Sequence, residues 1–224
     1  VTTDRRRLPG PAGRGLKYRT ATIPGMLAIA GGKGGSGKTT TTLGVARAID
    51  APTLAIDADC DLPNLHALAG VPRDPPDDGQ SHPDPAAASE TRVVPAPRGA
   101  AKRLGDRLRD LRDDDPLALV DCPAGAGPDA TVPLRIADRV LLVSTACVAG
   151  LRDAAKTAAM ARAVGTPVIG GAVTRARVAP PGVEDLLGCP VVATVPDAPE
   201  PLESREGQRA YRRLARTVTD QPKG

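Results

Sequence analysis

Short apolar runs alternate with segments of helical spacing along the chain from residue 26 onward. Runs with the length of strands lie at 26–30, 53–57, 92–96, 117–121, 139–144, 167–173 and 190–196. Helices are expected over 37–49, 100–113, 151–165 and 203–218. Continuous apolar strands separated by helices are typical of a parallel sheet covered on both faces. The pattern therefore predicts a single three-layer α/β domain over residues 26–219, with a mostly parallel sheet, followed by a tail at 220–224.

Two segments depart from this alternation. Residues 71–90 are rich in Pro and Asp and have no apolar face, which predicts a mobile surface excursion. Residues 1–25 are rich in Arg, Gly and Pro without periodicity, which predicts a disordered basic leader. We expect the native chain to start at Met26, the leader being a mis-assigned upstream extension. The alternative is a basic arm that contacts a polyanion.

The net charge of +4 is concentrated in the leader. Residues 1–25 hold six Lys or Arg and one Asp, whereas the rest of the chain holds 24 basic and 25 acidic residues. A basic surface for DNA is therefore not expected on the domain itself. The four cysteines have no C-x-x-C or zinc spacing, so we expect buried or half-buried thiols at Cys60, Cys122, Cys147 and Cys189.

The segment GKGGSGKT, residues 32–39, fits the phosphate-binding pattern G-x-x-x-x-G-K-[ST]. An apolar strand precedes it and a helix follows, which is the context that such a loop requires. Its glycines allow backbone N–H groups to converge on phosphates at the N-terminus of the helix. We expect Lys38 to contact the β- and γ-phosphates and the Thr39 hydroxyl to bind Mg²⁺. The predicted nucleotide-binding residues of this loop are Gly32, Lys33, Gly34, Gly35, Ser36, Gly37, Lys38, Thr39 and Thr40.

Three aspartates at or near strand ends add the acidic groups that nucleotide hydrolysis needs. Asp121 ends the strand LALVD and is expected to hold Mg²⁺ through a water molecule. Asp57 ends the strand TLAID and is a further candidate metal ligand. Asp59 lies two residues beyond Asp57 and points the same way if the chain is extended. A carboxylate there can orient the attacking water, and for both Asp57 and Asp59 the alternative is helix capping or a solvated position.

These motifs resemble those of the MinD/ParA family of deviant Walker A P-loop ATPases, and MinD proteins are the most similar group. KGGSGKTT is similar to the family's K-G-G-x-G-K-T, and DADCDLPNL looks like its first switch segment. DCPAG resembles the D-x-P-A-G of MinD, and the stretch ADRVLLVSTACVAGLRDAAKT resembles the strand and helix that follow the second switch in MinD. The resemblance covers residues 26 to about 218.

The resemblance implies an ATPase that uses ATP and Mg²⁺ and dimerises around the nucleotide. In the family the extra lysine, which matches Lys33, crosses to the phosphates bound by the other subunit. The family's water-orienting carboxylate matches Asp59. Lys33, Lys38 and Asp59 are therefore the predicted catalytic residues.

The residues expected around the base depart from the family pattern. Family members often contact adenine with an Asn-Arg pair after the sixth strand, where this sequence has Thr174 and Arg175. Thr makes fewer hydrogen bonds than Asn, which weakens the expected adenine selectivity. VPDAPEP resembles the family's Pro-x-Asp loop, so Pro196 and Asp197 complete the predicted base contacts.

We therefore predict a MinD-like ATPase that acts as an ATP-dependent dimerisation switch in spatial positioning, with slow hydrolysis stimulated by a protein activator or cargo. The alternatives are a nucleotide-binding scaffold without useful turnover and a ParA-type DNA partition ATPase, which the charge balance disfavours. We expect a cytoplasmic protein with weak or indirect membrane association at most, at the inner face. The reason is that the last helix is expected to pack its apolar face on the sheet, namely Ala210, Tyr211, Leu214, Ala215 and Val218.

Overall fold

The computed structural model describes residues 25–32, 34–73, 81–97, 101–113, 116–125 and 127–220. The strands are β1 (Met26–Gly31), β2 (Thr53–Asp57), β3 (His82–Pro83), β4 (Thr91–Val94), β5 (Leu117–Asp121), β6 (Arg139–Thr145), β7 (Val168–Thr174) and β8 (Val191–Val195). The helices are α1 (Lys38–Ala48), α2 (Leu65–Ala69), α3 (Ala101–Asp113), α4 (Pro128–Ile136), α5 (Val148–Ala163), α6 (Val183–Leu187) and α7 (Arg205–Thr219). The leader predicted at 1–25 lies outside the described residues except for Gly25.

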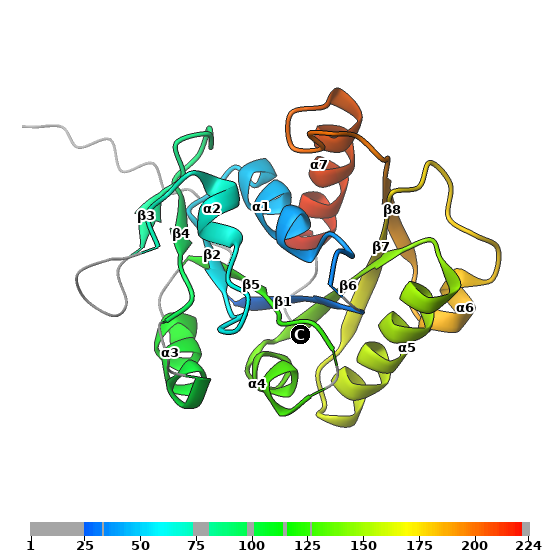
Figure 1. Cartoon of the computed structure of the whole chain (residues 1–224), viewed down its shortest axis with the longest axis horizontal. Helices are drawn as coiled ribbons and strands as arrows, with labels where there is room; N and C mark the ends of the chain where they lie inside the picture. Colours follow the sequence, from blue (N-terminus) through cyan, green and yellow to red (C-terminus); the bar gives the residue numbers. More distant parts are fainter. Residues whose placement is uncertain are drawn as a thin grey trace, which may run out of the picture.

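The strands of the described chain form one sheet with the order β3-β4-β2-β5-β1-β6-β7-β8. β3 pairs antiparallel with β4, and the other neighbouring strands pair in parallel. Figure 1 shows α1, α2 and α7 on one side of this sheet and α3, α4, α5 and α6 on the other. The predicted three-layer fold with a mostly parallel sheet is therefore confirmed.

Each strand predicted from an apolar run is present, with ends within two residues of the expected ones, and the predicted helices agree within three. The sequence pattern does not predict β3 or the short helices α2 and α6, because two to five residues are too few to show a period. It also misses α4, which begins at Pro128 and contains Pro133. Proline is favourable in the first turn of a helix but normally argues against a helix interior.

Each face of the sheet has its own apolar core, and β1 contributes to both. Met26 and Ala28 face the core beneath α3, α4, α5 and α6, whereas Leu27 and Ile29 face the core beneath α1, α2 and α7. This alternation follows from the two-residue period of a strand. The chain has no Phe or Trp, so both cores are built almost entirely from Ala, Val, Leu and Ile. The central strands are consequently buried on both sides and hold the loops at their carboxyl ends in place.

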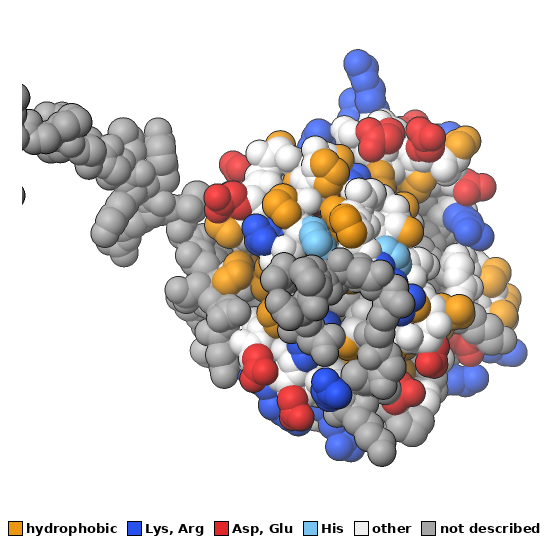
Figure 2. Space-filling model, turned by 60° about the vertical axis from the view of Figure 1, so that its left-hand side comes forward, with side chains coloured by type: hydrophobic (Ala, Val, Ile, Leu, Met, Phe, Trp, Pro, Cys, Tyr) orange, Lys and Arg blue, Asp and Glu red, His pale blue; other side chains and the backbone are white. Residues whose placement is uncertain are grey.

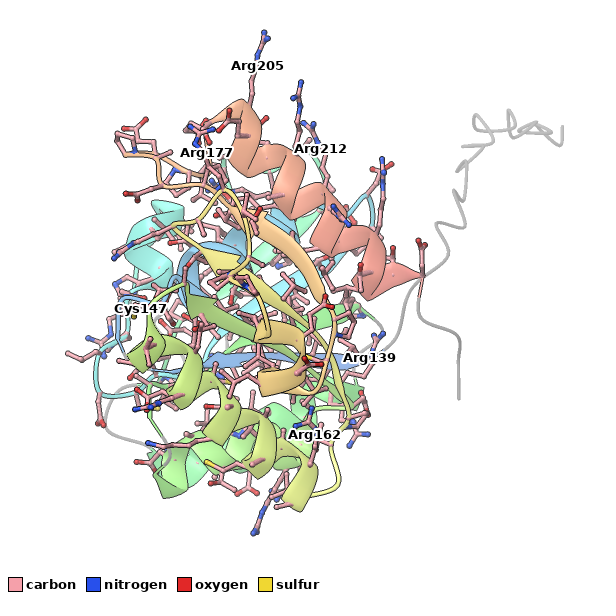
Figure 3. The ribbon with its side chains drawn as sticks, turned by 90° about the vertical axis from the view of Figure 1, so that its right-hand side faces the viewer. Arg139, Cys147, Arg162, Arg177, Arg205 and Arg212 are labelled. Atoms are coloured by element: carbon pink, nitrogen blue, oxygen red, sulfur yellow. The ribbon has the colours of Figure 1, made fainter. Side chains whose placement is uncertain are left out.

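The last helix, α7, packs on the sheet as predicted. Its apolar face is buried, while arginines such as Arg205 and Arg212 project outward (Figure 3). Tyr211 lies against α1 at Gly44, where an added Cβ would lie 2.6 Å from the tyrosine ring. Only glycine allows the two helices to approach so closely at this point. No helix in the described part of the chain is long and apolar enough to cross a membrane.

The segment before β4 contributes a buried ion pair, although its described residues other than Asp84 are exposed or half-buried. Asp84 is 6% exposed and accepts hydrogen bonds from Arg47 Nε at 2.7 Å and Nη2 at 3.0 Å. Figure 2 shows the side of the molecule that carries α2 and β3, with both histidine side chains at the surface. The predicted mobility of residues 74–80 lies outside the described chain.

We expect Asp84→Ala to lower the free energy of unfolding by about 3–5 kcal/mol, because it leaves the Arg47 guanidinium without its carboxylate in a nearly buried position. Asp106→Ala is the matched control, since Asp106 pairs with Arg109 on an exposed surface and its loss should cost less than about 1 kcal/mol. Urea unfolding of both variants measures the difference. Equal losses of unfolding free energy would show that the Arg47–Asp84 pair contributes no more to stability than an exposed ion pair.

Candidate functional site

A glycine-rich loop connects β1 to α1 at the carboxyl end of the central strands. Gly35 and Gly37 have φ values of +80° and +87°, in the left-handed region that favours glycine. Gly37 precedes the first helical residue, Lys38, and no described side chain caps this end of α1. The first N–H groups of α1 are therefore free to bind an anion, and the helix dipole favours one there. Lys33 lies outside the described residues.

Two aspartates meet beside this loop. In the register of β2 and β5, Asp57 is paired with Asp121, and β1 places Ile29 on the other side of Asp121. Asp57 and Asp121 are 1% and 2% exposed. Asp57 and Asp121 thus lie at the ends of adjacent strands, next to the strand that leads into the phosphate loop.

Burial raises the pKa of both carboxyl groups, because ionisation is unfavourable away from water. The pKa of Asp121 rises to about 7; the negative charges of Asp57 and Asp59 add to the effect of burial, while a hydrogen bond with Thr39 and the positive charge of Lys38 oppose it. The pKa of Asp57 rises to about 6, again mainly by burial. These interactions show that Lys38 and Thr39 lie close to the Asp121 carboxyl group.

The Asp57 carboxylate shapes the loop that follows β2. Its Oδ1 accepts the Asp59 N–H at 3.0 Å, and its Oδ2 accepts the N–H groups of Asn64 and Leu65 at 3.1 Å each. Asp57 therefore caps the beginning of α2 from within the sheet, which is the helix-capping alternative raised by the sequence. Asp59 itself is half-buried, and its Oδ1 accepts the N–H of Leu62 at 3.0 Å.

The residues around Asp121 fit a magnesium ion. Asp121 Oδ1 is buried and has no hydrogen-bond partner within the described residues. A buried carboxylate oxygen without a partner is costly, and a cation would satisfy it. The nearby Thr39 hydroxyl adds a second oxygen. No group of three or more His, Cys, Asp or Glu that could hold a metal occurs in the described chain, but Mg²⁺ at nucleotide sites is held by one or two protein oxygens together with phosphates and waters.

A cavity of about 350 Å³ opens beside the loop, between α1, the ends of β7 and β8, and α7. It contains the residues predicted to contact the base, Thr174, Arg175, Pro196 and Asp197. Tyr211, which the sequence pattern places on the apolar face of the last helix, also lines this cavity. Because Tyr211 has the spacing of the other buried residues of α7, the sequence alone does not indicate that it lines a cavity. The remaining lining residues are Gly37, Thr40, Val195, Ala198, Pro199 and Pro201.

Thr174 differs from the other cavity residues because it is bonded to protein. Its Oγ1 lies 2.7 Å from the carbonyl oxygen of Ser36 in the phosphate loop and 3.2 Å from the carbonyl oxygen of Ser144 in β6. The residue is 6% exposed. Arg175, which follows, is exposed and has a φ of +53°, unusual for a residue other than glycine. Thr174 thus joins β7 to the phosphate loop.

The cysteines agree with expectation except for Cys147. Cys60 is half-buried and Cys122 and Cys189 are buried, but Cys147 is exposed. It lies just before α5 (Figure 3), where its sulfur accepts the Gly150 N–H and contacts the Thr145 hydroxyl, and both contacts lower the pKa of the thiol. Capping the first turn of α5 explains why this thiol is not in the core.

The fold and the loop define a P-loop nucleotide-binding protein. The model of the CobQ/CobB/MinD/ParA nucleotide binding domain family matches residues 27–203. The chain belongs to this family.

Individual relatives agree with this assignment. An uncharacterised ATP-binding protein of Methanocaldococcus jannaschii is 28% identical over 196 residues, covering 77% of this chain and 74% of the relative. The septum site-determining protein MinD of Synechocystis sp. is 27% identical over 202 residues, covering 77% and 76%. The solved structure of MinD from Pyrococcus horikoshii, complexed with Mg-ADP, has a TM-score of 0.76 at 22% identity and covers 88% of this chain and 96% of that one. The structural likeness supports the fold.

Proposed function

We propose that this protein is a Mg²⁺-dependent ATPase that dimerises around ATP and acts as a nucleotide-driven switch in spatial positioning within the cell. The proposal rests mainly on the position of Asp121 beside the phosphate loop. One oxygen of its buried carboxyl group has no hydrogen-bond partner among the described residues, and Thr39 and Lys38 both interact with this group. Family membership and the MinD relative support the choice of ATP and the positioning role.

The residues have distinct roles in this proposal. Lys38 and the N–H groups of the loop bind the phosphates. Thr39 and Asp121 would hold Mg²⁺, Asp121 through a water molecule, and the ion when bound neutralises charge on the phosphates. Asp59 orients the water that attacks the γ-phosphorus, after which the bond to the ADP oxygen breaks and ADP and phosphate leave. Asp57, predicted as a metal ligand, is better suited to position Asp59, because three backbone N–H groups already bind its carboxylate.

The dimeric part of the proposal rests on Lys33, whose place in the loop resembles the lysine that crosses between subunits in the family. A cation supplied in trans stabilises charge that develops during phosphoryl transfer. Hydrolysis would therefore require two subunits, and separation of the subunits after hydrolysis would end each cycle.

We expect Lys33→Ala to keep the affinity of the monomer for ATP within about threefold and to lower hydrolysis by 100-fold or more, because losing a charge supplied in trans costs about 10³–10⁵ in related systems. Phosphate release, ATP affinity and ATP-dependent dimer mass by light scattering measure these effects. Lys38→Ala is the comparison variant and should lose nucleotide affinity itself.

Two outcomes would change the proposal. If Lys33→Ala loses ATP affinity as Lys38→Ala does, Lys33 is an ordinary phosphate contact within one subunit. If the wild-type protein binds Mg-ATP and dimerises but releases no phosphate, the protein is a nucleotide-binding scaffold.

A further inference from the structure

The hydroxyl of Thr174 lies between the phosphate loop and the sheet. Thr174 ends β7, and its Oγ1 is 2.7 Å from Ser36 O, a residue 138 positions earlier in the chain. A hydroxyl has one proton to donate. The shorter contact assigns that proton to Ser36 O, and the 3.2 Å contact with Ser144 O is the weaker one. The hydroxyl proton is therefore not available to a ring nitrogen of a purine base, and only the lone pairs of Oγ1 could still accept from a base amino group.

The rest of the Thr174 side chain also faces the loop. A Cβ placed on Gly37 would lie 3.2 Å from Thr174 Cγ2, so the methyl group packs closely against the backbone at Gly37. With 6% of its surface exposed, Thr174 presents little area to the base cavity. Its hydroxyl and its methyl group both act on the Ser36–Gly37 part of the loop.

The Ser36 carbonyl and the Gly37 N–H belong to one peptide unit. No peptide bond in the described chain is cis, so this unit is planar and trans, and its C=O and N–H point in opposite directions. A Ser36 carbonyl that is held toward Thr174 therefore directs the Gly37 N–H away from Thr174. Gly37 has a φ of +87°. Because glycine has no side chain, the backbone at this position can adopt several orientations at little cost. An external hydrogen bond is therefore what selects one orientation.

We propose that Thr174 is a positioning residue for the phosphate loop: it holds the Ser36–Gly37 peptide with its N–H toward the phosphates and does not discriminate between bases. Base discrimination then lies with the other polar groups of the cavity, on Arg175 and the loop at Pro196–Ala198. The inference rests on the proposed function only in requiring that the loop binds nucleoside polyphosphates.

The test compares Thr174→Val, which keeps the shape but removes the hydroxyl, with Thr174→Ser, which keeps the hydroxyl. Calorimetry measures the affinities for Mg-ATP, Mg-GTP and inorganic tripolyphosphate with Mg²⁺. We expect Thr174→Val to weaken all three by a similar factor of about 5–50, because Ser36 O is left unsatisfied and each 1.4 kcal/mol is tenfold. Thr174→Ser should retain all three within about threefold, and the ratio of ATP to GTP affinity should not change in either variant.

Three results would overturn the inference. One is a change in the ATP to GTP ratio in Thr174→Val without an effect on tripolyphosphate, which would make Thr174 a base contact. The second is no change in any of the three affinities. The third is an equal loss in Thr174→Ser, which would point to the methyl group instead of the hydroxyl.

Separate measurements keep the two proposals apart. The affinities of the wild-type protein test whether the loop binds nucleotides, whereas the ratio of variant to wild type tests the role of Thr174. If Thr174→Val does not fold, Thr174→Ala and Thr174→Ser form a pair that differs only in the hydroxyl. Thr174→Ala should then show the uniform loss and Thr174→Ser should not.

Discussion

Asp59→Ala is expected to lower ATP hydrolysis by about 10²–10⁴-fold, the range by which a positioned acid–base group accelerates a reaction, while ATP affinity stays within about threefold. Asp59 follows β2 on a loop that Asp57 holds through the Asp59 N–H. Removing the Asp59 side chain leaves that backbone bond and the phosphate loop in place. Phosphate release under saturating Mg-ATP measures the first effect, and calorimetry measures the second.

Two further variants separate the carboxylate from the loop. Asp59→Asn keeps an oxygen that can accept the Leu62 N–H but removes the charge, and hydrolysis should still be lost. Asp61→Ala is the matched control, since Asp61 is exposed on the same loop, and it should hydrolyse ATP at the wild-type rate. Normal turnover in Asp59→Asn would assign Asp59 to loop structure instead of to the attacking water.

Asp121→Asn is expected to stabilise the metal-free protein at pH 8 and to abolish Mg²⁺-dependent hydrolysis. The pKa of Asp121 is about 7 in the folded state against 3.8 for an unperturbed carboxyl group. The folded state therefore binds the proton more tightly, and this carboxyl group lowers stability progressively as the pH rises from about 4 to about 7. Above pH 7 the cost of the buried charge is fully present, on the order of 4 kcal/mol. Asparagine cannot ionise and avoids this cost.

Denaturant unfolding at pH 4 and pH 8 in the presence of a chelator tests the sign of this effect. Asp121→Asn should be more stable than the wild type at pH 8 and similar to it at pH 4. Asp106→Asn, at an exposed position, should match the wild type at both values. A loss of stability in Asp121→Asn at pH 8 would mean that the folded protein stabilises the Asp121 carboxylate, contrary to the assignment of an unpartnered buried oxygen.

The main architecture follows from the sequence because it depends on strong local patterns. The side chains of a continuous apolar run such as LALVD are buried on both faces only when the strand lies between two layers of helices. The strand β5 and the position of Asp121 at its end are therefore predictable. The phosphate loop is equally local, since its glycines, lysine and threonine are contiguous. The pairing of Asp57 with Asp121 then follows from both residues ending adjacent parallel strands.

The features that sequence reasoning misses depend on contacts between distant residues. Thr174 is expected to face the base, but its hydroxyl is bonded to Ser36, and nothing in the local sequence indicates that partner. Asp84 lies in a polar segment and becomes buried because Arg47 of α1 faces it. Tyr211 has the spacing of a core residue, and only the close approach of α7 to α1 brings its ring to the cavity beside the phosphate loop. Residues 1–24 and Lys33 lie outside the described chain, so the expectations for them stay predictions.

The cavity beside the phosphate loop is completed from both ends of the described chain. Gly37 and Thr40 come from the start of its first helix and the residue before it, whereas Tyr211 comes from α7, its last helix. During synthesis the chain grows from the N-terminus, so the phosphate loop leaves the ribosome long before Tyr211 does. A nascent chain that lacks α7 leaves this cavity without the wall that Tyr211 provides and exposes the surface of α1 that Tyr211 covers. The wall of this cavity is therefore complete only after α7 has been made and has docked on α1.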